Sequence, residues 1–317
     1  MVIAGCYSRL RLDAVRAPLL TVLVYVTVAL CWSGSWTVGK LGVASVPPLE
    51  LSTIRFALAG LLMLAIARAT GASLGLSHWR LLLVAAFFGI FGYNALVFVG
   101  LTLGPASDGA LIVPTLNPVL TVLFATFLGE RLTRNKIAGV AAATAGAIVV
   151  IVSAQSGAEV SSQRLVGDLL MLGGAACWSV YATLGTITTR HGSPLGVTAI
   201  ACLAGAAMLF PFGFLEHGYR DVPSWPVSAW LDIAYLVIFA TTIGFVLFYW
   251  AVRRFGAGLA SMVSYLVPVF ALVQAVVLLN EHPAALELAG GAIILAGVRL
   301  ATWRAAPINP LEDAGSA

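Results

Sequence analysis

Residues 106–130 read ASDGALIVPTLNPVLTVLFATFLGE, and residues 257–281 read AGLASMVSYLVPVFALVQAVVLLNE. Each segment is apolar and long enough to cross a bilayer as a helix. Each has a small and polar first half, a proline near its middle (Pro118, Pro268) and a glutamate at its exit (Glu130, Glu281). The proline and the glutamate are 12 residues apart in the first segment and 13 in the second. The chain is therefore expected to contain a duplicated membrane-spanning helix.

The composition places most of the chain in lipid. Hydrophobic residues make up 60% of the 317 residues, charged residues 9%, and the mean hydropathy is +1.00. A soluble domain would need about 25% charged residues. In lipid every backbone polar group must be paired inside a helix or a closed barrel, and the apolar runs do not alternate as barrel strands do. Cys31, Cys177 and Cys202 lie inside these runs, so we expect small apolar side chains and not a disulfide framework.

Ten apolar segments have the length of membrane-spanning helices. They lie at 20–39, 49–67, 80–102, 106–128, 136–152, 167–187, 195–215, 229–252, 257–279 and 285–303. The sequence therefore predicts an all-α integral membrane protein with ten transmembrane helices.

Basic residues are concentrated on one side of this topology. With the N-terminus inside, the inner loops and tails carry twelve Lys and Arg residues, and the outer segments carry three (Lys40, Arg164 and Arg220). Inner loops of membrane proteins are enriched in Lys and Arg. An even number of helices returns the chain to the side where it began. We expect a multi-pass protein of the cell (inner) membrane with both termini in the cytoplasm.

The polar stretch around residues 153–166 divides the helices into two sets of five, and these two sets are repeats. Matching pairs at offsets of 146 to 152 residues include Trp32 and Trp178, Gly92 and Gly244, Pro118 and Pro268, Glu130 and Glu281, and Gly146 and Gly297. Because five is odd, the second set must have the opposite orientation in the membrane. This predicts two inverted five-helix repeats, an architecture suited to alternating access around a central site.

The expected organisation has five parts. They are a cytoplasmic N-terminal tail (1–19), a first repeat (20–152), an external linker (153–166), a second repeat (167–303) and a cytoplasmic C-terminal tail (304–317).

Both repeats resemble a known family. Residues 94–152 contain Pro118, the motif LGERLT at 128–133 and small residues from Ala138 to Gly146, and they resemble one EamA-type repeat of the drug/metabolite transporter superfamily. Residues 248–298, with YWAVRR at 249–254, resemble a second. The resemblance implies a ten-helix transporter, often an exporter of amino acids, related metabolites or drugs. It also implies that the earlier helices of each repeat line a central cavity, while the fifth and tenth support packing.

The candidate substrate site combines aromatic and amide side chains. It comprises Trp32, Arg55, Asn94, Asn117, Trp178, Tyr181, Tyr249 and Tyr265. Trp32 and Trp178 lie near the middle of their helices, away from the interfaces where tryptophan normally anchors. They either fill the core or form an aromatic wall for an apolar or cationic group. With few charges, the site favours an amino acid or a hydrophobic metabolite over an inorganic ion.

Arg55 is the deepest clear charge. An arginine at the bilayer centre costs about 2.5 to 3.5 kcal/mol on insertion scales, and less near the interface. Two interpretations are open. Arg55 forms a structural ion pair with Glu50, Asp108 or Asp168, or it binds a substrate carboxylate. Arg55 corresponds to Ala201 in the second repeat, and Asn117 corresponds to Val267, so the cavity is expected to be asymmetric in charge.

Two pairs of residues are candidates for conformational control. Pro118 and Pro268 each free a backbone carbonyl and bend the helix, which makes them either fixed kinks or hinges. Glu130 and Glu281 are either helix-end carboxylates paired with nearby basic groups or gates. Small residues in the fifth and tenth helices favour close packing within the monomer over a dimer contact.

The residue types also exclude some functions. All four histidines lie in loops or at helix ends, and no helix has a central aspartate, so a membrane protease is not expected. We predict no enzyme activity, no cofactor, no metal and no nucleic-acid partner. The expected partners are a small-molecule solute and the lipid bilayer.

The sequence thus predicts a secondary transporter, an exporter of small organic solutes, that works by alternating access. The alternative is a non-transporting receptor or a lipid-handling enzyme on the same helices. The mode of coupling stays open between facilitated diffusion, exchange and protons carried by Glu50, Asp108 or Asp168.

Overall fold

A computed structural model describes residues 2–127, 134–153, 162–248, 263–280 and 282–302, and these residues form helices and no strand. Five helical segments are long and apolar enough to cross a membrane. They are Pro48–Ala69, Leu76–Leu103, Ser162–His191, Pro194–Glu216 and Val227–Phe248. Shorter apolar helical stretches lie at Ile137–Gly146 and Leu288–Gly297. The fold is a bundle of membrane helices, as the composition predicts.

The described part of the first half contains six α-helices. They are α1 (Val2–Ser45), α2 (Pro48–Ala69), α3 (Trp79–Ala86), α4 (Tyr93–Leu103), α5 (Ala106–Phe127) and α6 (Arg134–Ser153). A 3₁₀ turn, η1 (Leu76–His78), precedes α3, and a π-helical segment, η2 (Phe87–Gly92), joins α3 to α4.

The described part of the second half follows a similar order. Its α-helices are α7 (Ser162–His191), α8 (Pro194–Glu216), α9 (Val227–Tyr235), α12 (Val263–Leu279) and α13 (Ala285–Thr302). A 3₁₀ turn, η3 (Val222–Ser224), precedes α9, and a π-helical segment, η4 (Leu236–Ile243), follows it.

The helix starts follow from the sequence. Pro48 and Pro194, which are 146 residues apart, stand at the first positions of α2 and α8. Proline is favoured there because its missing N–H has no partner to lose and its φ is already helical. Ser193 also caps α8, since its Oγ accepts a hydrogen bond of 3.0 Å from Gly196 N.

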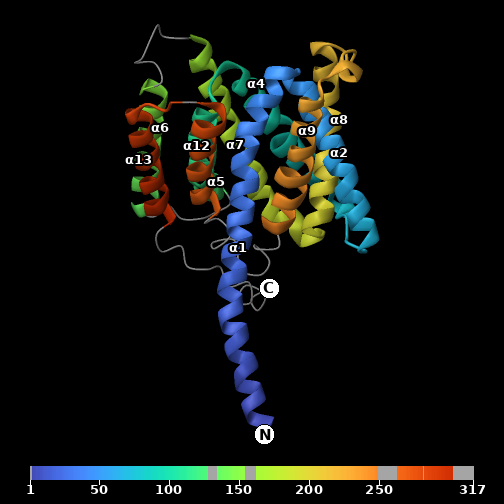
Figure 1. The fold of residues 1–317 in the computed structure, drawn as a ribbon, viewed down its shortest axis with the longest axis vertical. Coiled ribbons are helices and arrows are strands. Elements are labelled where there is room, and N and C mark those ends of the chain that lie inside the picture. Colours follow the sequence, from blue (N-terminus) through green and yellow to red (C-terminus); the bar gives the residue numbers. More distant parts are fainter. Residues whose placement is uncertain (1, 128–133, 154–161, 249–262, 281, 303–317) are drawn as a thin grey trace.

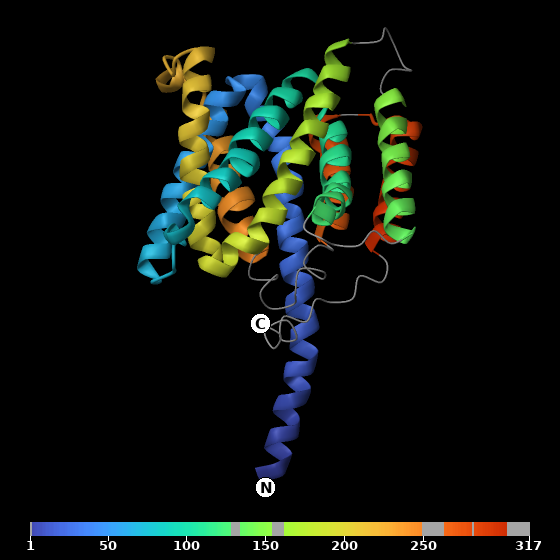
Figure 2. The ribbon, with the colours of Figure 1, turned by 180° about the vertical axis from the view of Figure 1, so that it is seen from behind.

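Helix α1 begins earlier than the apolar run that starts near residue 20. It projects well beyond the bundle at its N-terminal end (Figures 1 and 2). Leu, Arg and Ala, which dominate this stretch, are good helix formers, so the helix extends beyond the membrane-spanning run. The N-terminal segment expected as a tail is therefore helical.

Helices from the two halves pack together in pairs. Helix α2 packs along α8, α6 along α13, α1 along α12, and α5 along α7. The pairs α6–α13 and α2–α8 lie at opposite sides of the bundle in Figure 1. Glycines of the fifth and tenth segments, including Gly139, Gly146 and Gly290, are buried. These glycines thus allow α6 and α13 to pack closely.

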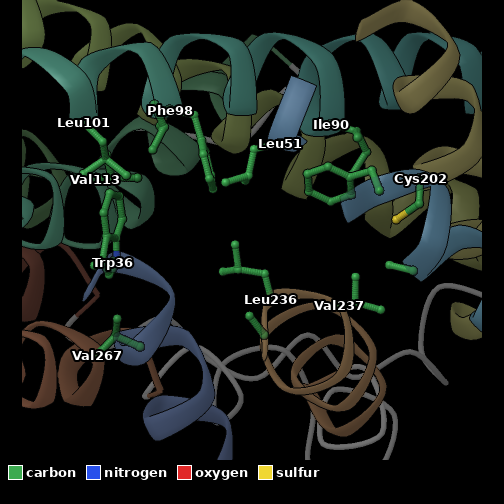
Figure 3. Close-up of a cluster of buried hydrophobic side chains, with 14 of the residues drawn as sticks. Trp36, Leu51, Ile90, Phe98, Leu101, Val113, Cys202, Leu236, Val237 and Val267 are labelled. Atoms are coloured by element: carbon green, nitrogen blue, oxygen red, sulfur yellow. The ribbon is translucent and has the colours of Figure 1, made fainter. Parts of the chain in front are cut away.

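The core lies where both halves meet. Figure 3 shows Trp36 of α1 between Val113 of α5 and Val267 of α12. Phe98 and Leu101 of α4 and Leu236 of η4 belong to the same buried cluster. This large apolar cluster therefore joins the first half to the second.

The two π-helical segments occupy corresponding places. Segment η2 ends at Gly92, and η4 ends just before Gly244, which lies 152 residues later. Short π segments inside α-helices are rare and frequent at functional sites. Both segments face the interior of the bundle, where Ile90 and Leu236 are fully buried.

Candidate functional site

A cavity lies between helices of both halves. Side chains of α1, α2, η2, α4, α5, α7, η4 and α12 line it. Five residues of the predicted site are among them: Trp32, Arg55, Asn94, Asn117 and Trp178.

Aromatic rings form one wall of the cavity. The rings of Trp32 and Trp178 meet edge to face with centroids 6.3 Å apart. Phe245 lies 5.8 Å from Trp32 and 5.7 Å from Trp178, and Tyr93 lies 5.1 Å from Trp178. Such distances and tilts are favourable between aromatic rings. The wall presents a large apolar surface whose rings hold one another in place.

Two aromatic side chains, Trp32 and Tyr181, each pack on the π segment of the other half. Trp32 of α1 lies against η4, and its Nε1 donates a hydrogen bond of 3.1 Å to Ala240 O. Tyr181 of α7 lies against η2, where its ring fills the space that a Cβ on Gly89 would need. Gly244 likewise leaves room for the Trp32 indole. Glycine at these two positions allows the close approach.

Arg55 projects from α2 into this cavity and is 6% exposed. Its Nε and Nη2 donate to Thr241 Oγ1 at 3.2 and 3.1 Å. The guanidinium also lies 4.7 Å from the centroid of the Phe56 ring, a cation–π distance. Arg55 is the only charged residue among the described residues that line the cavity.

The expected ion pair of Arg55 is not present in the described part of the chain. Asp108, in the first turn of α5, instead pairs with Arg164 of α7, with 2.7 Å between Arg164 Nε and Asp108 Oδ2 and 2.9 Å between Nη2 and Oδ1. Glu50 accepts a hydrogen bond of 2.9 Å from Tyr219 N. Sequence could not rank these partners, because the choice depends on which helices become neighbours.

Asn94 lies at the start of α4, directly after η2, and is 1% exposed. With its amide oriented to donate, Nδ2 forms a 2.8 Å hydrogen bond to Ile90 O, a carbonyl of η2. Its Oδ1 is buried and has no partner within the described residues. The side chain therefore links η2 to the cavity, and its Oδ1 remains able to accept a hydrogen bond.

Asn117 contributes to the contact between α5 and α7. With its amide nitrogen turned toward the carbonyls, Nδ2 lies 3.0 Å from Val113 O and 3.2 Å from Ala175 O. Ser179 Oγ donates back to Asn117 O at 3.0 Å. The corresponding contact between α1 and α12 uses Ser33, whose Oγ accepts from Gln274 Nε2 at 2.9 Å.

Polar groups also tie helices together at the end where α4 passes into α5. Lys40 Nζ donates to Leu101 O and to Gly104 O, both at 2.6 Å. A cation at the C-terminal carbonyls of a helix is electrostatically favourable. Near the N-terminus of α2, Glu216 Oε2 accepts from Leu49 N at 3.0 Å and from Glu50 N at 3.1 Å.

Comparison with protein families agrees with this architecture. The model of the EamA-like transporter family matches the chain twice, over residues 19–152 and 165–303. The chain belongs to the EamA-like transporter family.

Curated relatives are transporters by name. An uncharacterized transporter of Archaeoglobus fulgidus is 30% identical over 89% of this chain and 97% of its own length. The aromatic amino acid exporter YddG of Ancylobacter novellus is 31% identical over 88% of this chain and 96% of its own. A probable terminal-alkyne amino-acid exporter of Streptantibioticus cattleyicolor is 35% identical over 68% of this chain and 70% of its own. One solved crystal structure, 29% identical, covers 89% of this chain and 96% of its own with a TM-score of 0.64.

The remaining candidate residues of this EamA-like transporter have different outcomes. Tyr181 is buried against Trp178, with centroids 5.4 Å apart, and supports the cavity wall from behind without lining it. Tyr249, Glu130 and Glu281 lie outside the described residues. Tyr265 and Pro268 belong to α12 and Pro118 to α5, but their side chains also lie outside the described set.

Some cavity groups of the EamA-like transporter were not predicted. Tyr93 and Phe245 complete the aromatic wall, and Thr241 holds Arg55. The sequence could have indicated Tyr93 and Phe245, because they are aromatic residues 152 positions apart, next to the matched pair Gly92 and Gly244. Thr241 gave no such signal, since a threonine inside an apolar run also satisfies its hydroxyl on its own helix.

Proposed function

We propose that this protein is a secondary transporter that exports small organic solutes, amino acids or related hydrophobic metabolites, by alternating access. One observation carries the proposal. A cavity between the two halves combines an aromatic wall with one arginine. Pockets with mainly apolar walls and a few placed polar groups are typical of small-molecule sites. The exporter names of two relatives support amino acids as the first class to test.

The arrangement of contacts supports two inverted five-helix repeats, ten helices in all, over residues 20–152 and 167–303. A two-fold axis in the membrane plane would pair equivalent helices, and α2 packs along α8 while α6 packs along α13. The same axis would exchange the contact of α1 with α12 for that of α7 with α5. The ring contacts of Trp32 with Phe245 and of Trp178 with Tyr93 follow this exchange as well.

Within this scheme the paired segments α5 and α12 change the access to the cavity. Pro118 and Pro268 act as hinges, and Glu130 and Glu281 act as gates at opposite membrane faces. The distribution of basic residues supports a location in the inner membrane with both termini in the cytoplasm. The monomer is the transporting unit, because both halves contribute to one cavity.

Solute counterflow in proteoliposomes tests the proposal. Purified protein is reconstituted into vesicles loaded with one unlabelled solute from a panel of amino acids and related metabolites, and the uptake of the labelled solute is followed. We expect transient accumulation for aromatic or large apolar amino acids and none in protein-free vesicles. Absence of flux for the whole panel, from protein that elutes as a folded species, would overturn the proposal in favour of a receptor or lipid-handling enzyme.

A further inference from the structure

Two buried groups in the cavity have bonding capacity that the described protein does not use. The Arg55 guanidinium carries five N–H donors. Its Nε and Nη2 share a single hydroxyl oxygen, that of Thr241, and its Nη1 has no partner within the described residues. A buried cation normally pairs with an anion, because burial without one is costly. The cavity thus offers a cationic site for a group that comes from outside the protein.

The second group is an acceptor. Asn94 lines the same cavity, and its Oδ1 is buried and has no hydrogen-bond partner within the described residues. The other end of this amide is fixed, since Nδ2 donates to Ile90 O at 2.8 Å. Buried acceptors are nearly always satisfied in folded proteins, so an open one in a cavity indicates a missing donor. This acceptor is uncharged, which matters for the donor that it selects.

The two groups belong to neighbouring helices. Arg55 lies on α2 and Asn94 on α4, and these helices pack against each other. The aromatic wall around Trp32 and Trp178 borders the same space. A ligand can therefore present a carboxylate, an adjacent donor and an apolar body to one continuous surface.

We infer that the cavity selects monocarboxylates with an aromatic or large apolar body and a hydrogen-bond donor on C2, and that a hydroxyl serves there as well as an amine. This inference rests on the proposed transport function and names its substrate class. Arg55 binds the carboxylate, Asn94 Oδ1 accepts from the C2 group, and the aromatic wall covers the body.

The absence of an acidic partner decides the role of the amine. No Asp or Glu is among the described residues that line the cavity. A neutral amide oxygen accepts from O–H and N–H alike, whereas a carboxylate would favour an ammonium strongly. An amine that lacks the carboxylate meets only the positive charge of Arg55 and is repelled. 2-Hydroxy acids and 2-amino acids are thus substrates of one site.

Binding to the detergent-purified full chain tests this, followed by quenching of tryptophan fluorescence. The probes are phenylalanine, phenyllactate, 3-phenylpropionate and phenethylamine, which differ only in the C2 donor or the carboxylate. We expect phenyllactate and phenylalanine to bind within about threefold of each other, since both supply a donor. 3-Phenylpropionate should bind about tenfold more weakly, because it leaves the buried acceptor unpaired. Phenethylamine should not compete.

Two substitutions assign the roles. Asn94→Thr retains a hydroxyl that can donate to Ile90 O one turn earlier and removes the amide oxygen. It should bring phenyllactate and 3-phenylpropionate within about twofold of each other, a ratio that a purely structural defect would not change. Arg55→Gln should weaken all carboxylates about tenfold or more, with Arg55→Lys intermediate. Arg80→Gln, at an exposed arginine next to the Trp79 ring, is the matched control.

The outcomes separate the two proposals. Binding in the expected order without counterflow would refute transport and leave the ligand class standing. Phenylalanine binding without phenyllactate binding would show that the ammonium is required and would overturn the inference. Binding of phenethylamine, or of none of the four compounds, would also overturn it.

Discussion

The two halves of the chain contribute different chemistry to one cavity. Aromatic side chains come from both, with Trp32 matched by Trp178 and Tyr93 by Phe245. The charged and amide side chains that line it come from the first half only. Arg55, Asn94 and Asn117 correspond to Ala201, Val246 and Val267. The two repeats therefore form similar aromatic surfaces. The residues that differ between the repeats place the charged and amide groups of the cavity in the first half. A ligand with one polar end and one apolar end has a single preferred orientation in such a site.

The largest expected effect tests whether each half holds an aromatic ring of the other half on its π segment. Gly89→Ala would place a Cβ inside the Tyr181 ring, and Gly244→Ala would place one 2.5 Å from Trp32 Nε1. Neither aromatic group can move freely, so each substitution should destabilise the protein by about 3 kcal/mol. Counterflow should fall about tenfold or more for both, since one displaces Trp32 of the aromatic wall and the other displaces Tyr181, which supports that wall. Thermal unfolding and counterflow measure the two effects.

A control for this pair exists on α7. A Cβ on Gly173 would meet only the end of the flexible Leu96 side chain, at 3.1 Å, so Gly173→Ala should cost little. If Gly89→Ala were tolerated while Gly244→Ala was not, η4 would hold its aromatic ring firmly and η2 would not.

An intermediate effect is expected at the ion pair that joins the halves. Arg164→Ala removes the bidentate partner of Asp108, whose side chain is fully buried, while the Arg164 side chain is 25% exposed. The position that corresponds to Asp108 in the second half is Gly258, so no equivalent pair can form there. Stability should decrease by about 2 kcal/mol, the scale of a charged hydrogen bond with a buried partner. Differential scanning fluorimetry measures the shift in Tm.

The double variant Asp108→Asn with Arg164→Ala provides the check. It removes the buried charge together with its partner, so it should recover part of the lost stability. A double variant as unstable as the sum of the single variants would show that the two residues act independently.

The smallest effect distinguishes two equivalent tryptophans. Trp32→Phe removes the hydrogen bond to Ala240 O, whereas the Trp178 indole donates no hydrogen bond within the described residues. Both substitutions retain an aromatic ring. Trp32→Phe should therefore cost about 1 kcal/mol more than Trp178→Phe in chemical unfolding. Equal losses would mean that the bond to η4 adds nothing to stability.

Sequence was sufficient for the class of fold and for much of the cavity. Apolar length fixes membrane helices because lipid tolerates no unpaired backbone. Polar or aromatic residues deep in an apolar run, such as Asn94 and Trp178, have to face protein or a cavity, which explains why five predicted site residues line it. Tyr181 shares this signal and yet lies behind the wall, because a helix face is wide enough to serve both roles.

The partner of Arg55 could not be predicted in the same way. Its charge indicated a need for a partner, but Asp108 is held by Arg164 and Glu50 by the backbone of Tyr219. These choices depend on contacts between helices that are distant in sequence. The π segments were also invisible, because a change in the backbone hydrogen-bond register leaves no mark in an apolar sequence beyond the glycines that accompany it.

The two π segments also determine the direction in which the side chains of the following helices point. A π segment accommodates an extra residue in a helical turn, and in an α-helix one residue corresponds to a rotation of about 100°. Asn94 is the second residue after η2, and Phe245 is the second residue after η4. Without these segments both side chains would point about a quarter turn away from the cavity. The geometry of the site thus depends on the rotation that each π segment adds as well as on the identity of the residues. Each half contains such a rotation at the corresponding place.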